Sequence, residues 1–322
     1  KTLFPYTTLF RSSKLGHVEK EIGIPVVPGR VVHIDGDFLA YMVAYDDSKT
    51  IEAMKHNCDV KADKIRRMAG AETMQIHLTP KESNKGGRYD IALLREYQTG
   101  RKGKPKPRYL HLIRAYMHDT FGGIQHVTCE ADDGMAMAQY DAIKAGKRNL
   151  SVIATKDKDL CMVPGLQVDW DTGEITDTTD DFGYIRLADD KTAKKIRGRG
   201  WKMFWAQMLT GDTADNISGL PMCCDLDYLP RGKYKKIGPV LAYEILSPVK
   251  TNKEAFKIVK NLYALYNTAA NEEGSEFKPF ADWRDGRLLT AGEAFVSEAQ
   301  LLWMRRCHDP KDVINWLMET AL

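Results

Sequence analysis

Short β-branched runs alternate with helical stretches through the first half of the chain, and this alternation constrains the fold more than any other feature. The expected strands are 31–35, 74–79, 151–155 and 166–170, and the expected helices are 37–45, 52–68, 109–117 and 133–146. Strands that alternate with helices form parallel sheets, because each crossover helix returns the chain to the same edge. We therefore predict an α/β fold with a central, mostly parallel sheet flanked by helices.

Helices dominate the second half of the chain. We expect them at 201–209, 252–266, 293–307 and 311–319, whereas 182–202 is expected to be a charged, irregular excursion. The predicted organisation is an α/β domain over residues 19–210 and a helical lobe over residues 211–322. Residues 1–17 contain no acidic side chain, and we expect residues 1–18 to be an artefact or a disordered tail.

Carboxylates gather where the expected strands and helices begin or end. The eight positions are Asp35, Glu130, Asp132, Asp133, Asp157, Asp159, Asp212 and Asp215. In open α/β sheets, ligands bind at the carboxyl ends of the strands. Each acidic pair taken alone is typical of a turn or a helix cap. Four such groups at the ends of elements favour one shared site.

A site made of these eight groups would carry a formal charge of −8 and would need cations. Two like charges about 4 Å apart repel by roughly 4 kcal/mol at an effective dielectric constant of about 20. Oxygen ligands without His or Cys suit Mg²⁺ or Mn²⁺. Two such ions about 4 Å apart would clamp the attacking and leaving oxygens of a phosphodiester. The sequence therefore predicts a two-metal site for phosphodiester hydrolysis.

A basic segment over 81–108 holds nine Lys or Arg and three acidic residues, a balance of +6 in a chain whose net charge is +3. Tyr89, Tyr97 and Tyr109 lie among them and offer rings on which unpaired bases can stack. Beside an acidic pocket, such a segment is expected to guide a polyanion that the pocket would repel. A second basic patch, 231–236, precedes Gly238 and either contacts duplex phosphates or is a plain surface loop.

Four motifs occur together in one order: Ile34-Asp35-Gly36, Glu130-Ala131-Asp132-Asp133, Thr155-Lys156-Asp157-Lys158-Asp159, and the run GDTADNISGLP at 211–221. With them the sequence resembles the flap endonuclease and 5′-to-3′ exonuclease superfamily, in its phage and polymerase-associated branch. The resemblance spans residues 31 to about 250. It implies a PIN-like 5′-nuclease fold whose helical lobe contains a helix–three-turn–helix-like motif.

The resemblance also implies a role for each site residue. Asp35, Glu130, Asp132 and Asp133 would bind one metal ion, and Asp157, Asp159, Asp212 and Asp215 a second. Asp35, Arg88, Asp157 and Asp212 would carry the catalysis, with Arg88 and Lys85 at the scissile phosphate. Segment 81–108 would form an arch for a single-stranded 5′ end. The expected nucleic-acid contacts are Lys85, Arg88, Tyr97, Arg101, Lys102, Lys235, Lys236 and Gly238, with a potassium ion at the helix–three-turn–helix motif.

Three departures from the family pattern stand out. The family carries an Asp after the second strand, where this chain offers Thr79. Residues 222–236 are inserted before Ile237-Gly238-Pro239, and Val240 stands where the family has a Lys. Asp37 stands where the family has a small polar residue, and we expect it only to support the ligands.

We predict a metal-dependent, structure-specific 5′-nuclease that hydrolyses DNA with a free 5′ end or 5′ flap; the sequence leaves open RNA–DNA hybrids and the balance of exonuclease and flap cleavage. Two alternatives remain: a catalytically impaired branched-DNA-binding protein of the same fold, and a haloacid-dehalogenase-type phosphatase suggested by Asp35 and Asp37. Six cysteines do not make a disulfide scaffold, and no apolar run nears the roughly 18–20 residues that span a bilayer. We expect a monomer in the cytoplasm, that of the bacterial host if a phage encodes it.

Overall fold

The computed structural model describes residues 24–190, 193–223 and 235–322. The expected tail at 1–18 and most of the basic patch at 231–236 lie outside the described residues. So do the central residues of the insertion in the helix–three-turn–helix-like motif, where a potassium site was expected.

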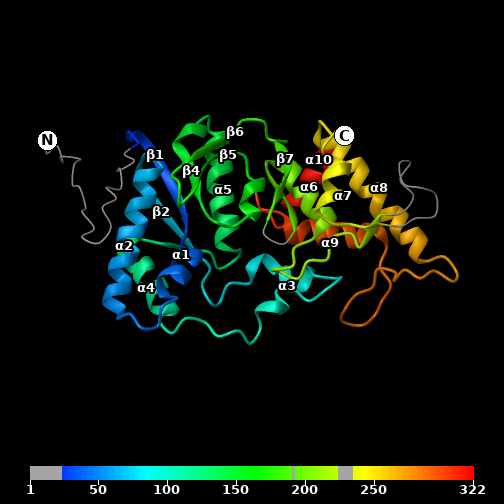
Figure 1. The fold of residues 1–322 in the computed structure, drawn as a ribbon, viewed down its shortest axis with the longest axis horizontal. Coiled ribbons are helices and arrows are strands. Elements are labelled where there is room, and N and C mark those ends of the chain that lie inside the picture. Colours follow the sequence, from blue (N-terminus) through cyan, green and yellow to red (C-terminus); the bar gives the residue numbers. More distant parts are fainter. Residues whose placement is uncertain (1–23, 191–192, 224–234) are drawn as a thin grey trace.

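A six-stranded sheet in the order β3-β2-β1-β4-β5-β6 forms the centre of the α/β part (Figure 1). Its strands are β1 (Val27–Asp35), β2 (Ala71–Leu78), β3 (Ile124–Gln125), β4 (Ser151–Ala154), β5 (Gly165–Val168) and β6 (Ile175–Thr178). All neighbours are parallel except β5 and β6. The predicted α/β fold with a mostly parallel sheet is therefore confirmed.

Helices cover both faces of this sheet. One face packs on α1 (Gly36–Ala44), α2 (Ile51–Met68) and α4 (Leu110–Phe121), and the other on α5 (Ala131–Lys144) (Figure 1). The alternation along β1 explains this, because Val32 and Ile34 face the first set while His33 and Asp35 face α5. Short helical turns join the elements: η1 (Lys85–Gly87), α3 (Arg88–Ile91), η2 (Thr99–Arg101), η3 (Arg148–Leu150) and η4 (Asp159–Met162).

The helical lobe is built around an aromatic core. Its helices are α6 (Trp201–Thr210), which the predicted boundary had assigned to the α/β domain, α7 (Pro239–Leu246), α8 (Asn252–Ala270), α9 (Ala291–Leu302) and α10 (Asp312–Ala321). Rings of Trp303 and Trp316 lie 4.3 Å apart between centroids, and Trp205 stacks on Trp316 at 5.5 Å. The helix expected to reach residue 307 ends at Leu302, because Trp303 adopts an extended conformation.

The segment expected to be irregular is a hairpin, so that prediction was wrong. Strands β7 (Tyr184–Asp189) and β8 (Lys194–Arg199) pair antiparallel. Ile185 and Leu187 alternate with outward polar residues, which is the period of a strand with one covered face. The charges of this segment lie mainly on its open side. A further pair, β9 (Met222–Cys223) and β10 (Lys235–Lys236), flanks residues that the structure does not describe.

Candidate metal centre

Asp35 lies at the carboxyl end of β1, in the middle of the sheet. Its side chain caps α1, where Oδ1 accepts a hydrogen bond from the Phe38 N–H at 2.9 Å, and Oδ2 accepts one from Thr155 Oγ1 at 3.0 Å. Burial, together with the charges of Asp37 and Asp157, raises the pKa of Asp35 to about 7. The group therefore resists ionisation unless a cation lies beside it.

Asp132 faces Asp35 from the first turn of α5. Burial raises its pKa well above the usual range, and the charges of Asp35 and Asp157 contribute next. The charges of these three carboxyl groups therefore interact, as expected from the positions of the three residues at the ends of strands and of a helix. We call Asp35, Asp132 and Asp157 the first acidic group.

Asp159, Asp212 and Asp215 form a second acidic group. One carboxylate oxygen from each lies within 4.8 Å of the others. Burial raises the pKa of Asp159 to about 7. Burial also acts on Asp212, but Lys158, whose Nζ lies 2.7 Å from Asp212 Oδ2, lowers the pKa of that carboxyl below its usual value. The two acidic groups meet through Asp157, whose charge also raises the pKa of Asp159.

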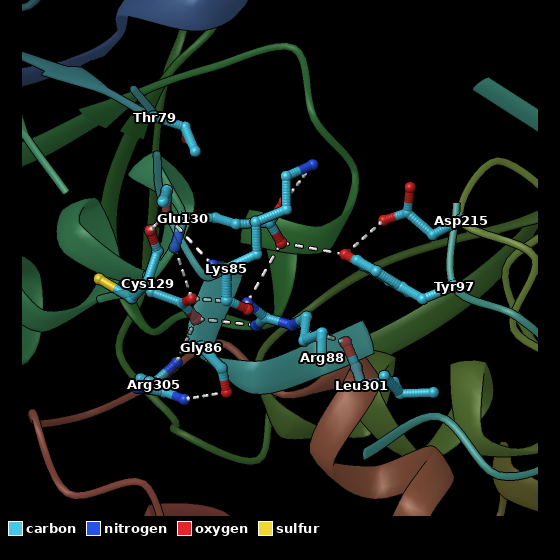
Figure 2. A network of polar contacts seen from close by, with 12 residues as sticks. Thr79, Lys85, Gly86, Arg88, Tyr97, Cys129, Glu130, Asp215, Leu301 and Arg305 are labelled. Atoms are coloured by element: carbon cyan, nitrogen blue, oxygen red, sulfur yellow. Dashed lines mark hydrogen bonds and ion pairs between the residues drawn. The ribbon is translucent and has the colours of Figure 1, made fainter. Parts of the chain in front are cut away.

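Glu130 links the basic segment to the second acidic group. The Tyr97 hydroxyl donates to Glu130 Oε2 at 2.9 Å, and it also lies 3.2 Å from Asp215 Oδ2 (Figure 2). Gln98 Nε2 donates to the same two carboxylates, and its Oε1 accepts from Lys85 Nζ at 2.5 Å. Sequence reasoning missed Gln98, which nothing in its local pattern marks as a site residue.

Tyr97 does not offer a ring to unpaired bases, which corrects the prediction. Only 2% of its surface is exposed, because the ring packs in the core while the hydroxyl holds two carboxylates. Burial raises its pKa well above the usual range, so the hydroxyl keeps its proton and remains a donor. Tyr89, whose ring meets Tyr97 edge-on, is exposed.

Arg88 does not face the pocket either, and its contact with a scissile phosphate stays a prediction. The side chain is 3% exposed, and its guanidinium donates to both oxygens of Asp133 at 2.7 and 2.9 Å. It also donates to Glu130 at 3.1 Å (Figure 2) and to the Trp303 carbonyl at 3.0 Å. Asp133 is fully buried, and Arg88 holds the pKa of that carboxyl below its usual value against the effect of burial. Both carboxylate oxygens of Asp133 are thus bound by the Arg88 guanidinium.

Thr79 connects Asp37 to α5 at the point where the family carries an Asp. Thr79 Oγ1 accepts from the Ala131 N–H at 2.9 Å, and the Thr79 N–H donates to Asp37 Oδ2 at 3.1 Å. Asp37 is also ion-paired with Arg114 at 2.9 Å. Its charge raises the pKa values of both Asp35 and Asp132. A carboxylate therefore lies near this position, supplied by α1 rather than by β2.

The other predicted basic contacts lie at the rim or away from the pocket. Arg101 is half exposed and reaches Asp215 Oδ1 at 2.5 Å, and Lys85 Nζ lies 3.5 Å from Glu130. Lys102 is exposed and paired with Glu96. Lys236 is exposed on β10, and Lys235 precedes it there. Gly238 precedes α7 with open space where a side chain would be, so its backbone is accessible.

The donors of both acidic groups suit a hard divalent cation, because all are carboxylate oxygens. The second group is partly neutralised by Lys158 and Arg101. For the first group, the hydrogen bonds within the described residues come from one hydroxyl and two backbone amides, with no cationic side chain among these donors. The raised pKa values of Asp35 and Asp132 are what uncompensated carboxylates produce. The residues therefore fit the predicted metal ions.

The parallel sheet, with carboxylates at its carboxyl edge and a helical lobe beside it, is similar in fold to a protein of known structure. The T5 D15 protein, solved with metal ions, superposes on this chain with a TM-score of 0.52, 15% identity, and coverage of 90% of this chain and 92% of the other. The fold expected from the resemblance is thereby confirmed. No family model matches the sequence, and no curated protein matches it.

Two further structures of the bacteriophage T5 enzyme are similar. One is the T5 5′-exonuclease with zinc, with a TM-score of 0.49, 15% identity, and coverage of 91% of this chain and 97% of the other. The second is a T5 flap endonuclease variant in complex with DNA and metal ions, with a TM-score of 0.48, 13% identity, and coverage of 90% and 92%.

Proposed function

We propose that this protein is a metal-dependent, structure-specific 5′-nuclease that hydrolyses DNA at or near a free 5′ end or flap. The observation that carries the proposal is the convergence of two carboxylate groups, with raised pKa values, at the carboxyl edge of a 5′-nuclease sheet. Without a cation, the carboxylates of such a cluster repel one another. Capping a helix or closing a turn does not require so many carboxylates in one place.

Divalent cations held by the two acidic groups would polarise the phosphodiester and favour attack by water. The protein's own side chains orient these ligands. Tyr97 and Gln98 fix Glu130 and Asp215 in place, and Lys158 holds Asp212 toward Asp159. Lys85, which is aligned by Gln98 at the pocket rim, is the cation best placed to contact a substrate phosphate.

The proposal is tested with 5′-flap and nicked duplex DNA labelled on the flap strand. With Mg²⁺, we expect cleavage near the junction or stepwise from the 5′ end, abolished by EDTA. Asp157→Asn should lower the rate by more than about 100-fold, since even the partners of metal ligands are worth 10–100-fold. Asp141→Asn, on the exposed side of α5, is the matched control and should cut normally.

The two alternatives predict different results. A branched-DNA-binding protein would bind the flap but not cut it with Mg²⁺ or Mn²⁺, and Thr79 would then be the first residue to examine. A phosphatase would release phosphate from a small ester and would leave both DNA substrates intact. Either result would overturn the proposed nuclease.

A further inference from the structure

The hairpin β7–β8 carries an arrangement of charge that its own stability does not explain. Residues 184–199 include six Lys or Arg and two Asp, a balance of +4, which exceeds the +3 of the whole chain. The cross-strand register places Arg186 directly opposite Arg197. Like charges in this position destabilise a hairpin.

These two arginines are unpaired within the part of the chain that the structure describes. Both side chains are exposed, and neither forms an ion pair with a described acidic residue. The two acids of the hairpin are already taken, because Lys194 pairs with Asp189 at 3.1 Å and Lys195 pairs with Asp190. Arg186 and Arg197 therefore present two uncompensated guanidinium groups side by side.

The open end of the hairpin, where β7 starts and β8 ends, lies at the edge of the metal centre. Arg199 reaches the Cys161 sulfur at 3.5 Å, and the Gly200 N–H donates to the Cys161 carbonyl at 2.9 Å, two residues after Asp159. These two contacts place the end of the hairpin that carries Arg199 beside the metal centre.

The same face has the composition of a phosphate-binding surface. Residues Tyr184, Arg186, Arg197 and Arg199 share it, whereas Ile185 packs into the lobe core. Binding of unpaired bases would need several exposed rings, and this face offers one, that of Tyr184. Guanidinium groups bind phosphates bidentately and carry no requirement for base sequence.

We propose that the β7–β8 hairpin is a contact surface for the phosphate backbone of duplex nucleic acid, with Arg186 and Arg197 as its principal contacts. The inference rests on the proposed nuclease function and adds to it a duplex contact outside the metal pocket and outside segment 81–108. The stability lost to the opposed arginines is regained when phosphates lie between them.

The test compares an Arg186→Gln/Arg197→Gln variant with the wild type in binding to a fluorescent flap duplex, with Ca²⁺ in place of Mg²⁺, at several salt concentrations. The slope of log K against log salt is negative, and each lost phosphate contact makes it shallower by about 0.9. We therefore expect the magnitude of the slope to decrease by nearly 2 in the variant. Lys61→Gln/Lys64→Gln on α2, on the other side of the sheet (Figure 1), removes the same charge and should leave the slope unchanged.

Two further measurements separate this role from a structural one. The arginine variant should melt at the wild-type temperature or higher, because the like-charge pair is gone. Its binding to a single strand without duplex should match the wild type. An unchanged salt slope, or an equal loss with the Lys61 and Lys64 control, would overturn the hairpin proposal. A wild type that neither binds nor cuts DNA would instead overturn the proposed function.

Discussion

Asp35 shows how the charge of the site governs stability. Its pKa is about 7 in the folded chain and near 3.9 when unfolded, so the folded state holds this proton more tightly. The resulting stabilisation is complete below about pH 4 and is lost as the pH rises through 7. Without metal, we therefore expect the melting temperature to fall by several degrees between pH 6 and pH 8, as scanning fluorimetry in EDTA would measure.

The Asp35→Asn variant is the control for this prediction. It should show a smaller fall, although not none, because burial also raises the pKa values of Asp159 and Glu298 to about 7. Mg²⁺ at pH 8 should raise the wild-type melting temperature more than that of the variant. Because the buried His33 and His77 have lowered pKa values and oppose this fall, the comparison with the variant decides: an equal slope in both proteins would contradict the assignment.

At the residue level, the sequence predicted the carboxylates but not the residues that hold them. Acidic residues at the carboxyl ends of parallel strands must meet at one edge of the sheet. Their spacing along the chain was therefore sufficient to predict that they gather. Arg88 and Tyr97 were predicted as substrate contacts because a local basic and aromatic pattern cannot show burial. Their partners Asp133 and Glu130 lie 45 and 33 residues away, and only the packed fold brings them together.

Helix α5 illustrates how an element is positioned by packing. A Cβ at Gly134 would lie 2.1 Å from His126 Cε1, and the His126 ring stacks on His77 with centroids 5.2 Å apart. Gly134→Ala should gain about 1 kcal/mol of helix propensity but lose about 1–3 kcal/mol to overpacking. We expect a net loss of stability in urea unfolding, with weaker metal binding, since Asp132 lies two residues earlier.

A matched variant isolates the clash in this prediction. Gly292→Ala in α9 meets no atom closer than 3.9 Å and should be neutral or stabilising. His126→Ala combined with Gly134→Ala should recover part of the loss, because it removes the ring that the methyl group meets. A destabilisation that is the same with and without His126 would refute this explanation.

Among the elements, the hairpin β7–β8 was the main one that sequence reasoning missed. The alternation of Ile185 and Leu187 with polar neighbours was the available signal, but the density of charge favoured an irregular segment. The parallel strands were easier to predict, because buried β-branched runs such as 151–155 are seldom anything but strands. The end of α9 could not be predicted, because it depends on a distant residue: Arg88 binds the carbonyl of Leu301 in the last turn and that of Trp303 just after the helix.

Over the whole molecule, Arg88 joins the α/β part to the helical lobe. Its guanidinium binds Asp133 at the start of α5 and the carbonyls of Leu301 and Trp303 at the end of α9, more than 200 residues along the chain. The Arg305 N–H reaches the same carboxylate at 3.3 Å. The metal centre lies between these two parts, because the pocket is lined by both Asp132 and Leu301. Its geometry therefore depends on how firmly they are joined.

Removing this guanidinium leaves Asp133 fully buried without its cation, a change that typically costs about 3–5 kcal/mol. We expect Arg88→Ala to lower the free energy of unfolding by that amount in urea titrations. Arg88→Lys should rescue little, because an ammonium cannot bind both carboxylate oxygens and a carbonyl in one plane. In Arg88→Ala/Asp133→Asn the loss should be smaller than in Arg88→Ala alone, because no buried charge remains. If the single variant instead lost less than about 1 kcal/mol, the pair would be an ordinary surface-like contact, and the two parts would be joined by apolar packing alone.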